Sequence, residues 1–191
     1  MSANYNIAVF VGSLRKESLN RKMARALAEA APSGMTLEII EIGDLALYSE
    51  DAEKEAPESW RKFRDRVRPA DAVLFVTPEY NRSVPGCLKN AIDVGSRPYG
   101  KSVWMGKPGA VVSVSPSPIG AFGANHHLRQ SMVFLNVPML QQPEAYIGGA
   151  ADMFDAQGKL TRENTKELLS KFLQAFATWI ARNSATAAKS G

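Results

Sequence analysis

Short apolar runs alternate with amphipathic stretches along the 191 residues of the chain. The apolar runs are rich in β-branched residues and stop at glycine, serine or proline, as is typical of strands buried on both faces. They predict strands at residues 5–11, 35–42, 72–77 and 109–115, and a short fifth strand at 137–140 with a continuation at 146–147.

Apolar residues spaced three and four positions apart predict a helix after each strand. Five helices are predicted. The first begins near Leu19 and ends before Pro32, the next three cover 60–67, 88–94 and 127–135, and the last runs from Thr161 to Ile180. In the last helix Thr161 is expected to be the N-cap, and its leucines and phenylalanines form a stripe that we assign to the core. Residues 184–191 are small and polar, and we expect a disordered tail there.

Strands that alternate with helices favour an α/β fold, with a parallel sheet covered by helices on both faces. The length suits one domain, which we place at residues 1–183. In such sheets ligands bind beyond the carboxyl ends of the strands, near the point where the strand order reverses. The loops of interest therefore cover residues 12–20, 78–86 and 115–123.

Composition and charge narrow the class of protein. With 45% hydrophobic and 22% charged residues, the chain is not of the disordered kind. Its single cysteine, Cys87, excludes an internal disulfide, and no cysteine and histidine set has zinc-ligand spacing. The start shows no signal peptide, and the apolar runs are too short to span a bilayer, so we expect a cytoplasmic protein without a membrane partner.

The net charge of +4 favours an anionic partner. The basic stretch 54–68 also contains acidic residues, and its aromatic residues do not alternate with bases. This pattern is typical of a solvated helix face and argues against nucleic acid as a partner.

The first loop, Gly12 to Asn20, leads from a strand into a helix and has the donors that a phosphate needs. Ser13, Ser18 and Asn20 can donate hydrogen bonds, and Arg15 can bind a dianion. An alternative interpretation, equally compatible with the motif, is that Ser18 only caps the helix and Arg15 is solvated. The spaced glycines of dinucleotide folds and the Gly-Lys-Ser/Thr of triphosphate loops are both missing, which favours the terminal phosphate of a mononucleotide.

The second loop is stiff and carries an aromatic residue at the tip of the third strand. Pro78 and Pro85 restrict its ends, Gly86 permits a close backbone approach, and Tyr80 offers an aromatic wall. Such a loop can present backbone groups to a ligand.

These two loops together resemble the NADPH-dependent FMN reductase family, and within it the bacterial chromate and quinone reductases. The resemblance is carried by Gly12-Ser13-Leu14-Arg15 with Ser18 and Asn20, by Thr77-Pro78-Glu79-Tyr80-Asn81, and by the segments 83–86 and 88–93. It covers residues 6 to 180. It implies a flavodoxin-like three-layer sandwich, a five-stranded parallel sheet with helices on both faces, that binds FMN.

The resemblance also implies a set of cofactor-binding residues. In the first loop, the residues implied to hold the phosphate are Ser13, Arg15, Ser18 and Asn20, with Leu14 and Leu19 as further cofactor contacts. In the second loop, the residues implied to line the flavin ring are Pro78, Glu79, Tyr80 and Asn81. The third loop adds Ser115 and Gly120. The third loop departs from the family pattern. Ala121 replaces a second glycine, and Gly123 stands where relatives carry an arginine, which calls into question the anion contact of that arginine.

The implied reaction is a two-step cycle. NAD(P)H passes a hydride to bound FMN and leaves, and a quinone, chromate or another metal oxyanion then takes the electrons. No catalytic residue is required beyond FMN, with Tyr80 shaping the open face of the flavin. Arg82, Arg97 and Lys101 flank the second loop and are candidate contacts for anionic substrates, with ordinary solvated side chains as the alternative.

The two histidines and the single cysteine are expected to have structural roles. His126 and His127 are expected to be packing or interface residues rather than catalytic bases, and Cys87 a packing residue. The resemblance implies a homotetramer or homodimer. Alternative functions are a flavodoxin-like electron carrier, although such carriers are usually acidic, a flavin reductase supplying a monooxygenase, and an anion-binding regulator. The sequence leaves the choice between NADPH and NADH open, as it does the physiological acceptor.

Overall fold

Five parallel strands form one sheet in the computed structural model of the chain, which describes residues 4–187. The strands are β1 (Tyr5–Val11), β2 (Met35–Ile39), β3 (Ala72–Thr77), β4 (Gly109–Val114) and β5 (Ala145–Ile147). Their order in the sheet is β2-β1-β3-β4-β5, and every neighbouring pair is parallel. This is the strand order of the flavodoxin-like fold, so the predicted fold class is confirmed.

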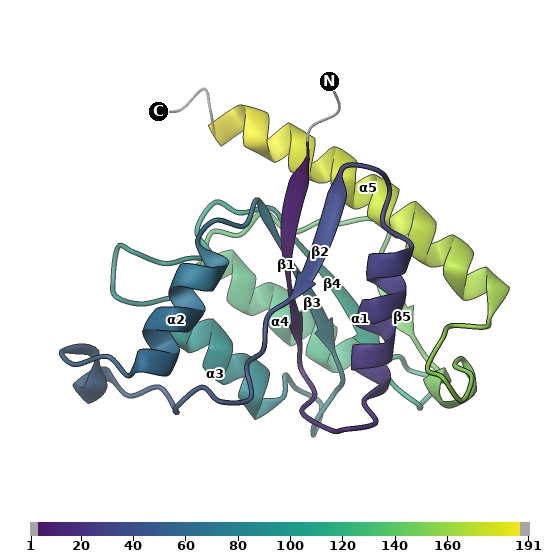
Figure 1. Cartoon of the computed structure of the whole chain (residues 1–191), viewed down its shortest axis with the longest axis horizontal. Helices are drawn as coiled ribbons and strands as arrows, with labels where there is room; N and C mark the ends of the chain where they lie inside the picture. Colours follow the sequence, from purple (N-terminus) through teal and green to yellow (C-terminus); the bar gives the residue numbers. More distant parts are fainter. Residues whose placement is uncertain (1–3, 188–191) are drawn as a thin grey trace.

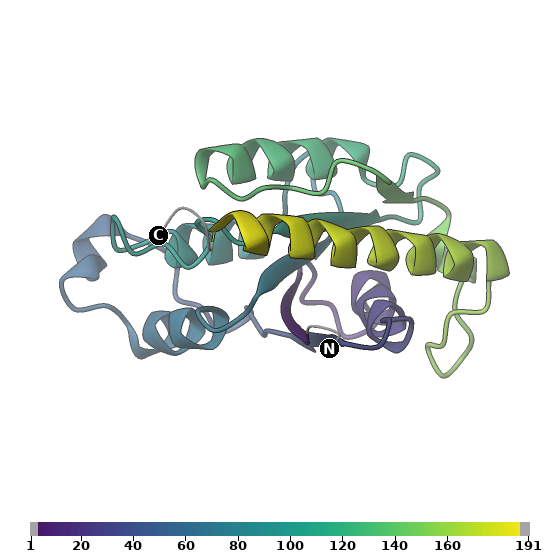
Figure 2. The same ribbon diagram turned by 90° about the horizontal axis from the view of Figure 1, so that it is seen from above.

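Helices cover both faces of the sheet. They are α1 (Leu19–Glu29), α2 (Glu58–Val67), α3 (Gly86–Gly95), α4 (Phe122–Phe134) and α5 (Glu163–Ala187), with short 3-10 turns η1 (Glu50–Glu53) and η2 (Ala150–Asp152). Apolar residues of α1 and α5 pack in one buried cluster, and those of α2, α3 and α4 pack in another. Figure 2 shows α1 and α4 on opposite sides of the sheet.

The central strands explain why two cores form. Every residue of β3 and β4 is buried, and successive side chains alternate between the two faces. In β1, Val9 packs with α1 and α5, whereas the next residue, Phe10, packs with the aromatic cluster on the other face. A continuous apolar run is therefore what a strand in this position requires.

Strand and helix bounds differ from the predictions where pairing or capping decides them. The second strand ends at Ile39, three residues early, because its ladder with β1 stops there, and Ile40 and Ile42 turn into the second core cluster. Residues 137–140 form no strand; Met139 makes one isolated bridge with Gly109, and β5 begins at Ala145. Helix α4 starts at Phe122, five residues earlier than predicted.

The last helix also departs from its predicted ends. It starts at Glu163, and Thr161 does not cap it, because the Thr161 hydroxyl donates to the carbonyl of Met153 instead (3.1 Å). The helix continues to Ala187, so residues 184–187 are helical rather than part of a tail. The rest of the predicted tail, 188–191, lies outside the described residues.

Helix α5 is 25 residues long. Even so, among residues 4–187 no helix combines the length and the apolar character that crossing a membrane requires.

Gly95, the last residue of α3, packs against the ring of Trp104. A Cβ at Gly95 would lie 2.4 Å from the nearest ring atom of Trp104. The ring is fully buried, its Nε1 donates to the carbonyl of Ile92 (2.8 Å), and its centroid lies 5.1 Å from that of Phe10. It therefore has little room to move.

We predict that Gly95→Ala lowers the free energy of unfolding by about 2 kcal/mol, because the added methyl overpacks the core. The matched control is Gly86→Ala at the other end of α3, where a Cβ would meet nothing within 4 Å. Its expected change is within about 0.5 kcal/mol. Urea unfolding measures both variants, and equal losses would contradict the prediction.

Candidate functional site

The three loops singled out in the sequence meet at one edge of the sheet. Because β1, β3 and β4 are neighbours, their carboxyl ends lie side by side, at the lower edge of Figure 1. The first two loops are in close contact. The amide of Gly12 donates to Val76 (2.9 Å), and a Cβ on Gly12 would lie 3.1 Å from Thr77 Oγ1 and 3.2 Å from Pro78 Cδ. A glycine at position 12 permits this approach.

The start of α1 provides hydrogen-bond donors to the first loop. Ser18 is the N-cap, and its hydroxyl oxygen accepts from the amide of Arg21 (3.1 Å), so the capping role considered from the sequence is real. The Ser18 hydroxyl hydrogen is still free to donate. The amides of Leu19 and Asn20 have no intrahelical acceptor, as in the first turn of any α-helix, and favour an anion there.

Asn20 carries a buried acceptor that the protein leaves without a donor. Its Nδ2 donates to the carbonyl of Val114 at the end of β4 (3.3 Å), which directs Oδ1 away from that carbonyl. Oδ1 is buried and has no hydrogen-bond partner. An unpaired buried acceptor is costly, and a ligand hydroxyl would satisfy it.

Two further residues of the first loop are available to a ligand. Ser13 is buried, and its hydroxyl has no hydrogen bond to any other described residue. Arg15 is exposed and forms no ion pair within the described part of the chain. Leu14 beside it is exposed as well. The donors therefore suit a phosphate, and the Asn20 acceptor suits a hydroxylated chain, so the residues present fit FMN.

A tight turn shapes the second loop. Tyr80 and Ser83 exchange both backbone hydrogen bonds (3.1 and 3.0 Å), and the residues between them, Asn81 and Arg82, have φ of 50° and 64°. Asparagine tolerates this left-handed conformation, whereas arginine adopts it at some cost. The turn leaves the Tyr80 side chain exposed at the tip of β3, where an aromatic wall was expected.

Glu79 is placed differently from its neighbours. Its Oε2 accepts from the amide of Ala124 in the first turn of α4 (3.0 Å), and its side chain is only 14% exposed. The resemblance implied that Glu79 lines the flavin. The structure directs Oε2 of its carboxylate to α4.

The third loop is held by a buried polar network that the sequence analysis missed. Ser113 Oγ donates to the carbonyl of Gly120 (2.7 Å) and accepts from Asn125 Nδ2 (3.1 Å). A serine inside the apolar run GAVVSV was the available signal. Gly120 has φ of 64°, and a Cβ there would lie 2.8 Å from the Tyr146 backbone. Ser115 accepts from the amide two residues on.

The residue after Gly120 shares its backbone conformation. Ala121 has φ of 58° and is the N-cap of α4, with no side-chain hydrogen bond to the helix. It occupies the place of the second glycine of the family pattern. The left-handed conformation explains why glycine suits this place.

The three candidate basic residues do not lie together. Arg82 lies in the turn of the second loop, 74% exposed, with its Nη1 3.5 Å from Glu79 Oε1. Arg97 follows the far end of α3, where its Nε is 3.8 Å from Glu53 Oε1 and its guanidinium lies over the Tyr48 ring. Lys101 comes after it. The ten residues of α3, about 15 Å in length, separate these two from the second loop.

Both histidines lie on α4 and make hydrogen bonds at its surface. His127 Nδ1 is 3.0 Å from Ser83 Oγ of the second loop. His126 Nε2 is 3.0 Å from the Tyr146 hydroxyl, which donates to Glu144 (2.7 Å). Desolvation by burial, and then the bond to Glu144, raise the pKa of Tyr146 to about 12, so this phenol stays protonated at neutral pH.

Cys87 lies at the start of α3, next to the second loop. It is half-buried, and its Sγ is 3.6 Å from the carbonyl of Gly12. Burial raises the pKa of the thiol, so the protonated form dominates at neutral pH. This environment agrees with a packing role.

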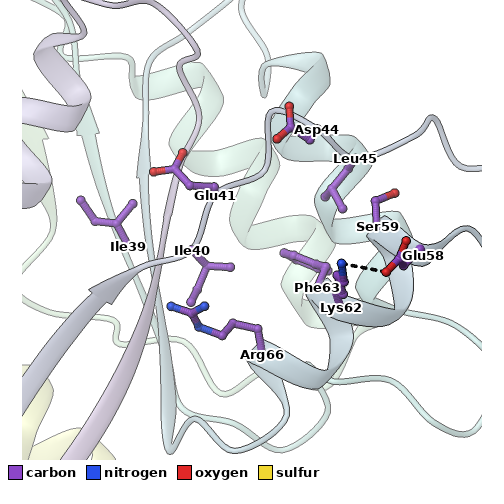
Figure 3. A pocket seen from close by; sticks show the side chains of 10 residues that line it. All are labelled: Ile39, Ile40, Glu41, Asp44, Leu45, Glu58, Ser59, Lys62, Phe63 and Arg66. Atoms are coloured by element: carbon purple, nitrogen blue, oxygen red, sulfur yellow. Dashed lines mark ion pairs between the residues drawn. The ribbon is translucent and has the colours of Figure 1, made fainter.

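A surface hollow of about 460 Å³ lies elsewhere, between the end of β2 and α2 (Figure 3). Its cationic side chains already have partners, because Lys62 pairs with Glu58, and Arg66 pairs with Glu38 on β2. None of its lining residues comes from the three loops. We therefore assign it no part in the site.

Comparison with known proteins places the chain in a family. The family model described as NADPH-dependent FMN reductase matches residues 5–152. A quinone reductase from Pseudomonas putida is 66% identical over 186 residues, which cover 97% of this chain and 100% of that protein. A 2-hydroxy-1,4-benzoquinone reductase from a Burkholderia species is 46% identical over 174 residues, 91% of this chain and 95% of that protein.

A solved structure agrees with this assignment. The flavoenzyme NAD(P)H:(acceptor) oxidoreductase FerB from Paracoccus denitrificans superposes with a TM-score of 0.88 at 44% identity, covering 94% of this chain and 98% of that one. The predicted enzyme class, a flavoprotein oxidoreductase with FMN and NAD(P)H as cofactors, is confirmed. The chain belongs to the NADPH-dependent FMN reductase family.

Proposed function

We propose that the chain is an FMN-dependent NAD(P)H:quinone oxidoreductase of the cytoplasm that also reduces chromate and other metal oxyanions. The proposal is carried by the hydrogen-bond donors at the start of α1, with the unpaired Asn20 acceptor beside them, in a chain 66% identical to a quinone reductase. The reducing environment of the cytoplasm suits a protein whose single cysteine has no second cysteine with which to form a disulfide.

Residues of all three loops are proposed to hold FMN. Ser13, Arg15 and Ser18, with the first amides of α1, bind the phosphate. The resemblance implied that Asn20 binds the phosphate, but its Nδ2 donates to Val114, so we propose instead that its free Oδ1 accepts from a hydroxyl of the ribityl chain. The remaining proposed contacts are Leu14 and Leu19 in the first loop, Pro78, Tyr80, Asn81 and the backbone of Glu79 in the second, and Ser115 and Gly120 in the third.

Bound FMN supplies the redox chemistry of both half-reactions. The protein needs no side chain that gains or loses a proton during turnover. Loop amides are the groups that can stabilise negative charge on the flavin ring, and the exposed Tyr80 ring borders the place where a planar donor or acceptor stacks. We propose that NAD(P)H and the acceptor use the same open face of the flavin in turn.

Arg82 is the basic residue that we propose attracts anionic substrates. Its guanidinium is largely exposed and lies in the second loop itself. Arg97 and Lys101 were candidates of the same kind in the sequence, but they lie beyond the far end of α3. Chromate and the phosphates of NADPH are the anions concerned.

An anaerobic absorbance experiment tests the function. We expect the purified protein to be yellow, to lose its flavin bands when NADPH or NADH is added, and to recover them when a quinone is supplied. The recovery rate with chromate, measured separately, ranks that acceptor. A protein that FMN cannot reconstitute, or whose flavin is not reduced by either nucleotide, would contradict the proposal. FMN loss during purification would instead favour a flavin reductase that releases its flavin.

Arg15→Ala is predicted to raise the Kd for FMN about tenfold, because a charge-assisted bond to the phosphate is lost. The matched control is Arg25→Ala, which removes the same charge from an exposed position farther along α1. Titration of FMN fluorescence measures both, and a similar Kd for the two variants would count against the phosphate contact.

A second copy of the chain is the proposed protein partner, in a homodimer or homotetramer. An exposed apolar surface supports this proposal: Tyr99 and Phe134 are each 90% exposed, and Val133 and Met105 are exposed too. It borders a hollow of about 600 Å³ between the ends of α3 and α4. Apolar patches of this kind are typical of protein interfaces.

Phe134→Glu is predicted to lower the molar mass in solution, because a carboxylate buried in an apolar interface is costly. Leu47→Glu is the control, since Leu47 is also highly exposed but lies in the loop after β2. Light scattering after size exclusion reads the mass. An unchanged mass for Phe134→Glu, or an equal drop for Leu47→Glu, would argue against this surface.

A further inference from the structure

The N-terminus of α4 is capped by a residue from a different loop. Its own N-cap position is Ala121, whose side chain has no oxygen and makes no capping bond. The first amides of a helix lack intrahelical acceptors and favour a negative charge nearby. The Glu79 carboxylate provides both an acceptor and a negative charge, because its Oε2 accepts from the amide of Ala124 at 3.0 Å. These residues are 45 positions apart in the chain.

The contact depends on the absence of a side chain at position 123. A Cβ on Gly123 would lie 2.9 Å from Glu79 Oε2 and 2.9 Å from the carbonyl oxygen of Arg82. The second of these atoms belongs to the backbone and cannot rotate away. Gly123 therefore lets the second loop approach α4 closely.

A second bond fixes the same loop one helical turn further along α4. His127 Nδ1 lies 3.0 Å from Ser83 Oγ, at the other end of the turn that begins at Tyr80. Ala124 and His127 are three residues apart, so the two contacts lie within about one turn of α4. The guanidinium of Arg82 lies 3.5 Å from Glu79 Oε1 and adds an attraction within the loop.

We propose that Glu79 is a positioning residue: by capping α4, its carboxylate fixes the turn that carries Tyr80 and so holds the flavin-facing wall of the site. This proposal rests on the proposed function for its effect on FMN. The attachment of the second loop to α4 is a separate statement, which can be tested without the flavin reaction.

Three substitutions separate the roles of the carboxylate. Glu79→Ala removes the acceptor, whereas Glu79→Gln keeps an amide oxygen that can accept from Ala124. Glu58→Ala is the matched control, because Glu58 lies in the first turn of α2 and pairs with Lys62, outside the three loops. It removes the same charge from the start of a helix without touching the site.

Hydrogen–deuterium exchange of the purified holoenzyme gives the direct readout. In Glu79→Ala we expect peptides covering 78–85 and 120–127 to exchange about tenfold faster, since a capping bond and a charge-assisted bond are lost. FMN release on dilution, followed by fluorescence, is expected to accelerate by about the same factor, and the KM for a quinone to rise more than kcat falls. Glu79→Gln is expected to restore most of the protection, and Glu58→Ala to behave as wild type.

Gly123→Ala disturbs the same contact between the second loop and α4 from the other side, because the added methyl group on α4 pushes the loop away. We expect the same local loss of protection, and a smaller added effect when Glu79 is already alanine, because the two substitutions disturb one contact. This variant keeps the proposal testable if Glu79→Ala fails to fold.

Several results would overturn the proposal. Unchanged exchange in both segments of Glu79→Ala would show that the carboxylate does not hold the loop. A Glu79→Gln variant as impaired as Glu79→Ala would show that accepting the hydrogen bond from Ala124 is not sufficient to hold the loop, which contradicts the capping role. Faster exchange without faster FMN release would show that the contact between the second loop and α4 does not affect FMN binding. A wild-type chain that binds no FMN would refute the proposed function, while the exchange data would still decide the attachment.

Discussion

Burial of the central strands on both faces is the constraint on which the rest of the structure depends. Because β1, β3 and β4 are almost entirely apolar, they lie in the middle of a sheet with helices on either side. The crossovers then bring three separate loops to one edge. The polar residues of the site owe their proximity to strands that have almost no polar side chains, and those strands form a rigid base for them.

The loops are joined by a small number of specific contacts once they meet. Asn20 ties the first loop to the end of β4, Gly12 lets the first loop press on the second, and Glu79 joins the second loop to α4. Ser113 holds the third loop through its bond to the Gly120 carbonyl, and Asn125 donates to Ser113. These polar side chains are therefore held in fixed positions by hydrogen bonds within the protein. Only Oδ1 of Asn20 is left among them without a partner, and it is available to a ligand.

Much of this could be predicted because burial and local capping leave a pattern in the sequence. The runs at 72–77 and 109–115 give the central strands nearly to the residue, and Ser18 indicates the start of α1. Side-chain direction leaves no such pattern. The role of Glu79 depends on where α4 begins, which is set by tertiary packing rather than by neighbours in sequence. The distance of Arg97 from the second loop, by contrast, follows from α3, whose predicted range 88–94 lies within one or two residues of the observed ends.

The protonated state of Cys87 has a chemical consequence beyond packing. Quinones are electrophiles, and thiolates add to them readily, whereas thiols do so slowly. The chain has one sulfhydryl group, at the start of α3 beside the second loop. Burial raises its pKa and keeps the nucleophilic form scarce at neutral pH. If quinones are the acceptors, as proposed above, the scarcity of thiolate at Cys87 disfavours its covalent arylation by them.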